Sequence, residues 1–281
     1  LRPVPIEGDV QPDPPPAPGV GGITAFSGGV DSCFTVVRGR RGAPPGPHRD
    51  ADLTAGLMVH GFDIDGADVA TFDSAFARSR RILGAHGMDA YALRTDVRRL
   101  EAATGCDWET QGHGIWLAFA LACLEQWFAR TVVPSTYPYD QPRARWASNP
   151  VTDPLLGSTA RPLWHDGAAF DKLDKVVALA DAPAVLDDLR VCWQGAELDR
   201  NCGRCFKCVV TQACFWIEGV EAPGAFDVAA AVDDLAAVAL TDAYKVRLGQ
   251  RMVARARGRG RHDLADAVTG ALAAVGEEVE P

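Results

Sequence analysis

A short loop near the N-terminus has the composition of an anion-binding site. It reads Ser-Gly-Gly-Val-Asp-Ser over Ser27–Ser32, after an apolar run at Gly22–Phe26 and before helical spacing at Asp31–Arg38. The first backbone N–H groups of a helix lack intrahelical partners, and the helix dipole is positive there, so an anion is stabilised. Gly28 and Gly29 let the backbone approach a ligand closely. The loop therefore predicts a phosphate-binding site.

The remaining side chains of this loop narrow the kind of phosphate site. Ser27 and Ser32 supply hydroxyl donors, whereas Asp31 repels a bare phosphate. A Mg²⁺ ion bridging Asp31 to the phosphates removes that conflict, because magnesium prefers carboxylate and phosphate oxygens. A Walker-type loop ends in Gly-Lys-Ser/Thr, and this loop has no lysine. We therefore expect a magnesium-dependent site of another type, with Asp31 in a catalytic role.

The segment Phe26–Ser32 resembles the loop of the PP-loop ATP pyrophosphatase superfamily. This superfamily includes GMP synthetase, NAD synthetase, asparagine synthetase, 7-cyano-7-deazaguanine synthase and tRNA thiolation enzymes. The resemblance implies a parallel-sheet, HUP-like α/β domain, ATP with Mg²⁺, and an adenylate intermediate formed with release of pyrophosphate. The nucleotide-binding residues that it implies are Ser27, Gly28, Gly29, Val30, Asp31 and Ser32.

Two polar residues follow the second predicted strand, which covers Leu53–Gly61. Members of the superfamily place adenine contacts after this strand, so the resemblance makes His60 and Asp63 candidates for the nucleotide's base or ribose. Polar residues in an exposed turn at a strand end are also common without any ligand. Both interpretations stay open for these two residues.

Four of the eight cysteines lie within seventeen residues, at the spacing C-x9-C-x2-C-x2-C. They are Cys192, Cys202, Cys205 and Cys208. Four thiolates at short loop spacings suit tetrahedral Zn²⁺, and a site with four protein ligands is usually structural. An iron–sulfur cluster also accepts such a spacing and is the alternative. The spacing resembles that of 7-cyano-7-deazaguanine synthase, whose family carries zinc after the PP-loop core.

The other cysteines, Cys33, Cys106, Cys123 and Cys214, are interpreted as small core residues. Cys33 is also a weak candidate nucleophile, because a thiolate beside the start of a helix is stabilised. No signal peptide precedes the Pro-rich N-terminus, so we expect a reducing cytoplasm and no disulfides.

Several polar residues of the middle of the chain are candidates for binding the substrate. His113 lies at the start of a long helical pattern at Gly112–Arg130, and Ser135 and Tyr137 follow a strand predicted at Thr131–Pro134. Ligand sites of parallel sheets form at the carboxyl ends of their strands. The stretch from 135 to 168 contains five prolines and is predicted to be irregular, and a long irregular stretch in a compact domain is commonly functional.

Four charged residues further along complete the predicted site, namely Asp153, Lys172, Lys175 and Arg190. A lysine at the α-phosphate or at the leaving pyrophosphate stabilises the charge that develops in the transition state. Lys172 and Lys175 share one helical face, and Lys175 is the predicted catalytic lysine, with Lys172 in a substrate-binding role. A solvated helix face is the alternative for each lysine.

Segments of the chain also resemble a group of uncharacterised PP-loop proteins linked to sugar or natural-product pathways. These segments are His60–Asp63, Asp153–Leu155, His165–Gly167 and Leu189–Trp193, and the resemblance extends over residues 22–218. It implies no established reaction.

Strands alternating with helices predict βαβ units on a parallel sheet. A further strand is expected at Ala90–Arg94 and an amphipathic helix at Ala67–His86. The predicted organisation is a disordered Pro-rich segment at 1–21, the ATP-binding α/β domain at 22–190, the cysteine knuckle at 191–218 and a helical tail at 219–281.

The composition limits the partners. A net charge of −9 argues against general affinity for nucleic acid, and no apolar run is long enough to cross a membrane. Arg247, Arg251 and Arg255 recur at every fourth position of the tail. A solvated helix face is the preferred interpretation, and a patch for phosphate, tRNA or an acidic carrier protein is the alternative.

These features together predict an ATP-dependent adenylating enzyme that releases AMP and pyrophosphate. It would activate a carboxylate or amide oxygen of a small molecule for attack by a nitrogen nucleophile, as in biosynthetic amide or nitrile formation. No glutaminase domain is recognisable, so ammonia would come from solution, from an amino substrate or from a partner protein. Sulfur insertion, with a sulfur-supplying partner, and a non-catalytic nucleotide-binding subunit are the alternatives. Homo-oligomer formation is left open.

Overall fold

The computed structural model describes residues 19–40, 52–141, 145–158, 161–221 and 223–277. Within them, five strands form one sheet in the order β3-β2-β1-β4-β5, and every neighbouring pair is parallel. The strands are β1 (Gly22–Ala25), β2 (Leu53–His60), β3 (Asp89–Arg94), β4 (Arg130–Pro134) and β5 (Leu163–Asp166). The predicted α/β class with a parallel sheet is confirmed.

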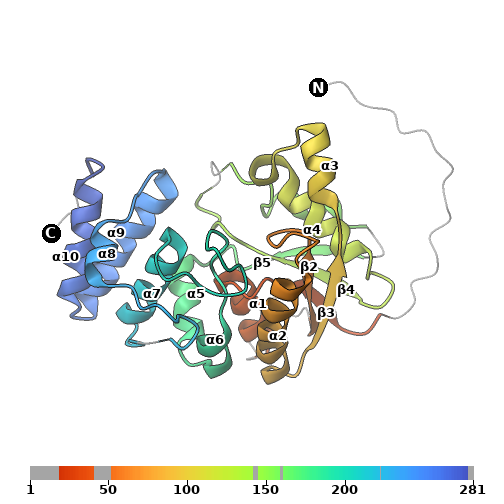
Figure 1. Ribbon diagram of the computed structural model, residues 1–281, viewed down its shortest axis with the longest axis horizontal. Coiled ribbons are helices and arrows are strands. Elements are labelled where there is room, and N and C mark those ends of the chain that lie inside the picture. Colours follow the sequence, from red (N-terminus) through yellow and green to blue (C-terminus); the bar gives the residue numbers. More distant parts are fainter. Residues whose placement is uncertain (1–18, 41–51, 142–144, 159–160, 222, 278–281) are drawn as a thin grey trace.

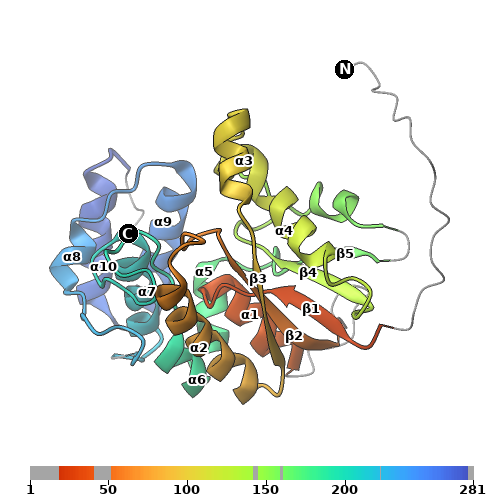
Figure 2. The same ribbon diagram turned by 45° about the vertical axis from the view of Figure 1, so that its right-hand side comes forward.

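Helices surround this sheet and continue beyond it. The first group is α1 (Val30–Arg40), α2 (Val69–Ala85), α3 (Val97–Thr104), α4 (His113–Ala122), α5 (Lys172–Leu179) and α6 (Pro183–Asp188). The second group is α7 (Phe206–Ile217), α8 (Val232–Ala236), α9 (Ala243–Gly258) and α10 (His262–Ala273). Figures 1 and 2 show α1 and α2 beside one face of the sheet and α4 beside the other.

The strand order reverses direction between β1 and β4, the two strands at the centre of the reversal. The chain runs outward from β1 to β2 and β3, then returns to β4 on the other side of β1. Such a reversal leaves a crevice beyond the carboxyl ends of the two central strands, where parallel sheets bind ligands. The residues that follow β1 and β4, Ser27–Ser32 and Ser135–Tyr137, therefore meet at this end of the sheet.

Two sequence predictions need correction. The stretch 135–168, predicted to be irregular, contains β5 and a 3₁₀ turn at Asp153–Leu156. The strand has only four residues, Leu-Trp-His-Asp, and pairing with β4 rather than an apolar pattern defines it. The long helix predicted for Gly112–Arg130 ends at Ala122, because hydrogen bonds to the third preceding carbonyl then form tight turns leading into β4.

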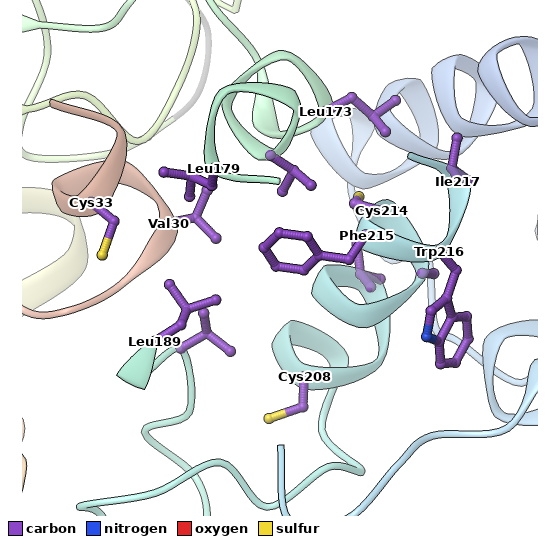
Figure 3. Close-up of a cluster of buried hydrophobic side chains, with 14 of the residues drawn as sticks. Val30, Cys33, Leu173, Leu179, Leu189, Cys208, Cys214, Phe215, Trp216 and Ile217 are labelled. Carbon is purple, nitrogen blue, oxygen red and sulfur yellow. The ribbon is translucent and has the colours of Figure 1, made fainter. Parts of the chain in front are cut away.

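The largest hydrophobic cluster joins the sheet domain to the cysteine region. It contains Phe26 and Val30 beside the first loop, Val176 and Leu179 of α5, and Phe215 of α7, all at most 4% exposed. Figure 3 shows side chains of α1, α5 and α7 gathered in one group. The boundary predicted at residue 190 therefore does not separate two cores.

The C-terminal helices lie on the far side of α5 and α7 from the sheet (Figure 1). Two arginines of α9, and Arg259 directly after it, form ion pairs with acidic residues elsewhere in the chain. Arg251 lies 2.5 Å from Asp171, and Arg255 and Arg259 lie 2.7 and 2.6 Å from Glu218. The predicted solvated face is therefore partly an ion-paired seam between α9 and the elements beside it.

Two predictions concern the ends and the environment of the chain. Most of the segment 1–21, predicted to be disordered, lies outside the described residues. In the described part of the chain, no helix combines the length and the apolar character that a membrane crossing needs.

Candidate functional site

The loop between β1 and α1, Ser27–Ser32, is named here the glycine loop. Gly28 has a φ of +77°, in the left-handed region that glycine adopts without strain. The Gly29 amide donates to Ser27 Oγ at 3.3 Å, and Ser32 Oγ donates to the Gly29 carbonyl at 3.1 Å. The loop leads directly into the first turn of α1, where backbone N–H groups have no earlier carbonyl in the helix.

Three predicted site residues from distant segments meet beside this loop. Lys175 Nζ lies 2.5 Å from Asp31 Oδ1 and 2.5 Å from the Ser135 carbonyl. The Lys175 side chain is only 1% exposed, whereas that of Asp31 is 36% exposed. A buried ammonium is stable only when paired and hydrogen-bonded, and both partners are present. The amine is thus held at the crevice, next to a carboxylate that solvent reaches.

The Asp31 carboxylate also interacts with a second lysine of α5. Lys172, one turn before Lys175 on α5, has its pKa lowered by burial, and the Asp31 carboxylate partly opposes that shift. The positive charge of Lys207 also acts on Lys172, so these lysines share one electrostatic environment. Lys175, paired with Asp31, is thus the cation fixed at the glycine loop, and Lys172 lies one turn away on the same helix.

Arg190 joins the glycine loop to the end of β2. Its backbone N–H donates to the Gly28 carbonyl at 2.8 Å. Its guanidinium, 4% exposed, lies 3.3 Å from Asp63 Oδ2 and donates to the Leu198 carbonyl at 2.9 Å. The structure therefore brings Arg190 and Asp63 together as an ion pair, so each is already occupied by the other. The Nε atom of Arg190 is buried and has no hydrogen-bond partner among the described residues.

His60 is placed differently from the other predicted nucleotide residues. It is 4% exposed, its ring stacks on Phe72 at 4.3 Å, and Nε2 lies 2.8 Å from the Asp65 carbonyl. These contacts stabilise the turn after β2. Gly61 shapes the same turn, because its φ is +106° and a Cβ there would lie 2.0 Å from the Thr95 carbonyl oxygen.

Aromatic side chains form a wall beside the crevice. The His113 ring lies 5.3 Å from Trp108 and 4.7 Å from Trp146, and Tyr137 lies 6.1 Å from Trp146 and 4.8 Å from Tyr244. Burial lowers the pKa of His113 to about 4, against the opposing effect of the nearby carboxylates. The imidazole is therefore neutral at neutral pH.

Polar atoms of this wall lack protein partners. His113 Nδ1 and Trp146 Nε1 are buried and have no hydrogen-bond partner among the described residues. Buried polar atoms are usually satisfied, so such atoms mark where a ligand or water would bind. Burial also raises the pKa of Tyr137, which keeps its hydroxyl protonated.

Asp153 is fully buried within a hydrogen-bond network. It accepts hydrogen bonds from Ser148 Oγ at 2.6 Å and from the Asn149 amide at 3.1 Å, and it lies 2.7 Å from His165 Nδ1. The His165 side chain is 2% exposed, and its Nε2 has no partner among the described residues. Asp153 thus lies between the end of β5 and the start of α4, where its negative charge partly offsets the lowering of the His113 pKa.

The four cysteines of the knuckle come together as a candidate metal site. All four Sγ atoms lie within 4.8 Å of one another, with Cys192–Cys205 at 3.8 Å and Cys202–Cys208 at 3.9 Å. A tetrahedron of sulfurs bound at about 2.3 Å has edges of about 3.8 Å. The hydrogen bond between Cys205 and Cys208 lowers the pKa of Cys205 and raises that of Cys208, so the pair favours one thiolate. The site can hold a metal ion.

The remaining cysteines are separate from this cluster. Cys33 and Cys214 are completely buried, and burial raises the pKa of each thiol, that of Cys214 to about 12. A buried thiol with a raised pKa is a weak nucleophile. The prediction of core residues is confirmed for Cys33 and Cys214, whereas Cys106 is only partly buried and Cys123 is exposed because it follows the end of α4. The burial of Cys33 also disagrees with a nucleophilic role.

Several residues of the site were not singled out from the sequence. Asn201 precedes one of the four clustered cysteines, Lys207 lies between two of them, and Trp146 follows an Arg-rich stretch that gives no periodic signal. Lys207 was detectable as a lysine held by the cysteine spacing near a predicted phosphate loop. Asn201 and Trp146 had no such signal, because their roles depend on contacts with distant segments.

Comparisons of the chain with protein-family models, with curated proteins and with solved structures gave no match.

Proposed function

We propose that this protein is an ATP-dependent adenylating enzyme of the PP-loop type. The single observation that carries the proposal is the meeting of Asp31, Lys175 and Ser135 beside the glycine loop, at the crevice between β1 and β4. An anion site at a helix start, a partly exposed carboxylate and a fixed ammonium are the groups that binding Mg-ATP requires.

Each group of the site has a separate task in this proposal. The glycine loop binds the β- and γ-phosphates, and Asp31 binds Mg²⁺, whose charge offsets that of the phosphates. Lys175 then stabilises the negative charge that develops when the bond between the α- and β-phosphates breaks. Lys172 adds positive charge near Asp31, and Arg190 holds the loop through the Gly28 carbonyl. Pyrophosphate leaves, and the substrate oxygen carries the adenylate.

The wall of His113, Tyr137, Trp146 and Tyr244 is the proposed place for the substrate. A neutral imidazole with an unpaired buried nitrogen and a buried indole N–H can orient a polar ligand by hydrogen bonds. A nitrogen nucleophile, either ammonia or an amine, would then displace AMP to form a C–N bond in a biosynthetic small molecule. The nitrogen would come from free ammonia, from an amino substrate or from an ammonia-supplying partner protein.

Sulfur insertion is less well supported by the site. A thiolate carrier or nucleophile would be needed near the adenylate, and the nearest cysteine, Cys33, is buried with a raised pKa. The four-cysteine site would then hold an iron–sulfur cluster instead of zinc. A non-catalytic nucleotide-binding subunit would bind Mg-ATP and form no pyrophosphate.

The test of the proposed function is a product analysis with ATP labelled at the α-phosphate. Carboxylates and amides are supplied as substrate pools, with ammonium or amines as nucleophiles. We expect labelled AMP together with an equal amount of pyrophosphate, and Asp31→Asn should abolish both. Formation of ADP would contradict cleavage between the α- and β-phosphates, and Mg-ATP binding without turnover in any pool would favour the non-catalytic subunit.

A further inference from the structure

The segment Leu189–Cys192 touches two functional parts of the molecule at once. It begins after α6, runs past the glycine loop, and ends in the first cysteine of the four-cysteine site. All four of its residues are at most 8% exposed. A buried segment with fixed partners on both sides can transmit a constraint from one to the other.

On the glycine-loop side, Arg190 makes the contacts. Its amide donates to the Gly28 carbonyl at 2.8 Å, and a Cβ on Gly28 or Gly29 would lie 3.7 or 3.6 Å from Arg190 atoms. The backbones of the two segments are therefore in van der Waals contact. The Arg190 guanidinium adds bonds to Asp63 and to the Leu198 carbonyl.

On the cysteine side, the segment is held by Asn201, the residue immediately before Cys202. Asn201 Oδ1 accepts hydrogen bonds from the amides of Val191 at 2.8 Å and Cys192 at 3.2 Å. Asn201 Nδ2 donates to the Leu189 carbonyl at 2.7 Å and to the Ala225 carbonyl at 2.9 Å. The side-chain amide of Asn201 thus makes two hydrogen bonds as acceptor and two as donor, which is its full capacity, and the residue is 3% exposed.

The hydrophobic core continues across the same boundary. Val30 of the glycine loop, Leu189 and Cys208 belong to one buried cluster. Figure 3 shows Leu189 between the helix that carries Val30 and the helix that carries Cys208. Close-packed side chains transmit displacement, since few voids are present to absorb it.

We propose that metal binding at the four cysteines sets the position of the glycine loop, with Arg190 and Asn201 as positioning residues. The metal would fix Cys192 and Cys202, the Asn201 amide would hold Leu189–Cys192 between them, and Arg190 would hold Gly28. The metal site then governs nucleotide affinity as well as local stability. The link to nucleotide affinity rests on the proposed function; the link to the loop's position does not.

The test compares zinc-loaded full-length wild-type protein with two variants and a matched control. Cys205→Ser removes a metal ligand and leaves Arg190 and Asn201 in place, whereas Asn201→Ala cuts the hydrogen bonds beside the metal site. Arg200→Ala changes the neighbouring residue, whose side chain is 48% exposed, and is the control. Zinc content, amide hydrogen exchange of the peptide covering residues 26–34, and the Kd for Mg-ATP are measured for each.

We expect exchange in this peptide to be about tenfold faster in Cys205→Ser and Asn201→Ala, because local opening becomes easier. The peptide of β4 should exchange as in wild type, and Arg200→Ala should match wild type throughout. The Kd for Mg-ATP should rise about tenfold in the same two variants. If Cys205→Ser unfolds globally, the test rests on Asn201→Ala: faster exchange of the 26–34 peptide, together with unchanged exchange of the β4 peptide, supports the coupling.

Unchanged exchange at residues 26–34 in a zinc-depleted, folded Cys205→Ser protein, or in folded Asn201→Ala, would overturn the coupling. The failure of the proposed function has a different signature. In that case the zinc-loaded wild-type protein would bind no Mg-ATP, while exchange in the loop would still depend on the metal and on Asn201.

Discussion

At the residue scale, the decisive feature is a buried lysine whose partners come from other segments. Lys175 has one carboxylate and one carbonyl as partners, and its side chain has no solvent to replace them. Both partners fix the ammonium at one point beside the glycine loop. A fixed charge needs no reorganisation when the charge of the reacting group develops, which is the basis of electrostatic catalysis.

Substituting this lysine tests the assignment. Lys175→Met keeps much of the aliphatic stem and removes the charge, and we expect pyrophosphate formation to fall by about a hundredfold or more. Lys245→Met is the control, because Lys245 lies on α9 and bonds Thr241 outside the site. Activity is measured as pyrophosphate release, and circular dichroism verifies the fold. Near-normal release by folded Lys175→Met would remove Lys175 from the catalytic residues.

His113 gives a prediction about pH. Burial lowers its pKa from 6.5 to about 4, so between these values the unfolded chain binds a proton that the folded protein does not. The neutral His113 therefore costs the folded protein no stability above about pH 6.5, and the free energy of unfolding decreases as the pH falls from 6.5 toward about 4. A shift of this size corresponds to about 3 kcal/mol.

We therefore expect His113→Gln to flatten the dependence of the unfolding free energy on pH in this window. The measurement is urea unfolding at a series of pH values from about 7 to about 4. His262→Gln, at an exposed position, should keep the wild-type slope. An identical slope in His113→Gln would show that His113 is not the buried neutral group.

At the element scale, the C-terminal helix α9 is attached by its arginines to acidic residues of neighbouring elements. Glu218, at the end of α7, is only 3% exposed on its side chain and accepts from both Arg255 and Arg259. Arg247 and Asp140, which also pair, are both about half exposed, at 47% and 49%. Exposed pairs contribute little, because water and salt screen them.

This contrast predicts unequal effects of two substitutions. Glu218→Gln should lower the unfolding free energy by about 1 to 2 kcal/mol, after allowing for the solvent exposure of the arginines. Arg247→Ala should lower it by less than about 1 kcal/mol. Denaturant unfolding of both variants checks the order. Equal effects would mean that the burial of Glu218 does not strengthen its pairs.

At the scale of the whole molecule, the four-cysteine site and the sheet domain share one hydrophobic core. Metal binding should therefore stabilise the entire fold and not only the residues around the cysteines. Four converging thiols without an ion would also repel one another once ionised, whereas an ion holds them together.

We expect the purified protein to contain about one zinc per chain and no iron. Removal of the metal by a chelator should lower Tm by on the order of 10 °C, because structural zinc contributes several kcal/mol to folding. Metal content is measured by mass spectrometry and Tm by calorimetry. Iron content with visible absorption would show an iron–sulfur cluster instead of zinc. An unchanged Tm after metal removal would exclude a structural role for the metal.

Much of the framework is predictable from local patterns. Alternating strand and helix signals predict the parallel sheet, and the cysteine spacing predicts the cluster, which the structure brings within 4.8 Å. The strand β5 and the end of α4 at Ala122 are not predictable in this way. A four-residue strand is defined by its neighbour β4, and Leu124, Trp127 and Phe128 continue the helical spacing after α4 although the backbone turns there.

The sequence by itself determined the glycine loop, the cysteine spacing and the alternation of the first four strands with helices, because each depends on residues close together in the chain. Only the tertiary structure decided that Lys175 meets Asp31, which lies 144 residues earlier, and that Arg190 and Asn201 connect the loop to the cysteines. These contacts depend on which strands are neighbours, on how α5 packs against α1 and on how α7 packs against α5. No local pattern encodes that choice, since it follows from burying the whole core at once.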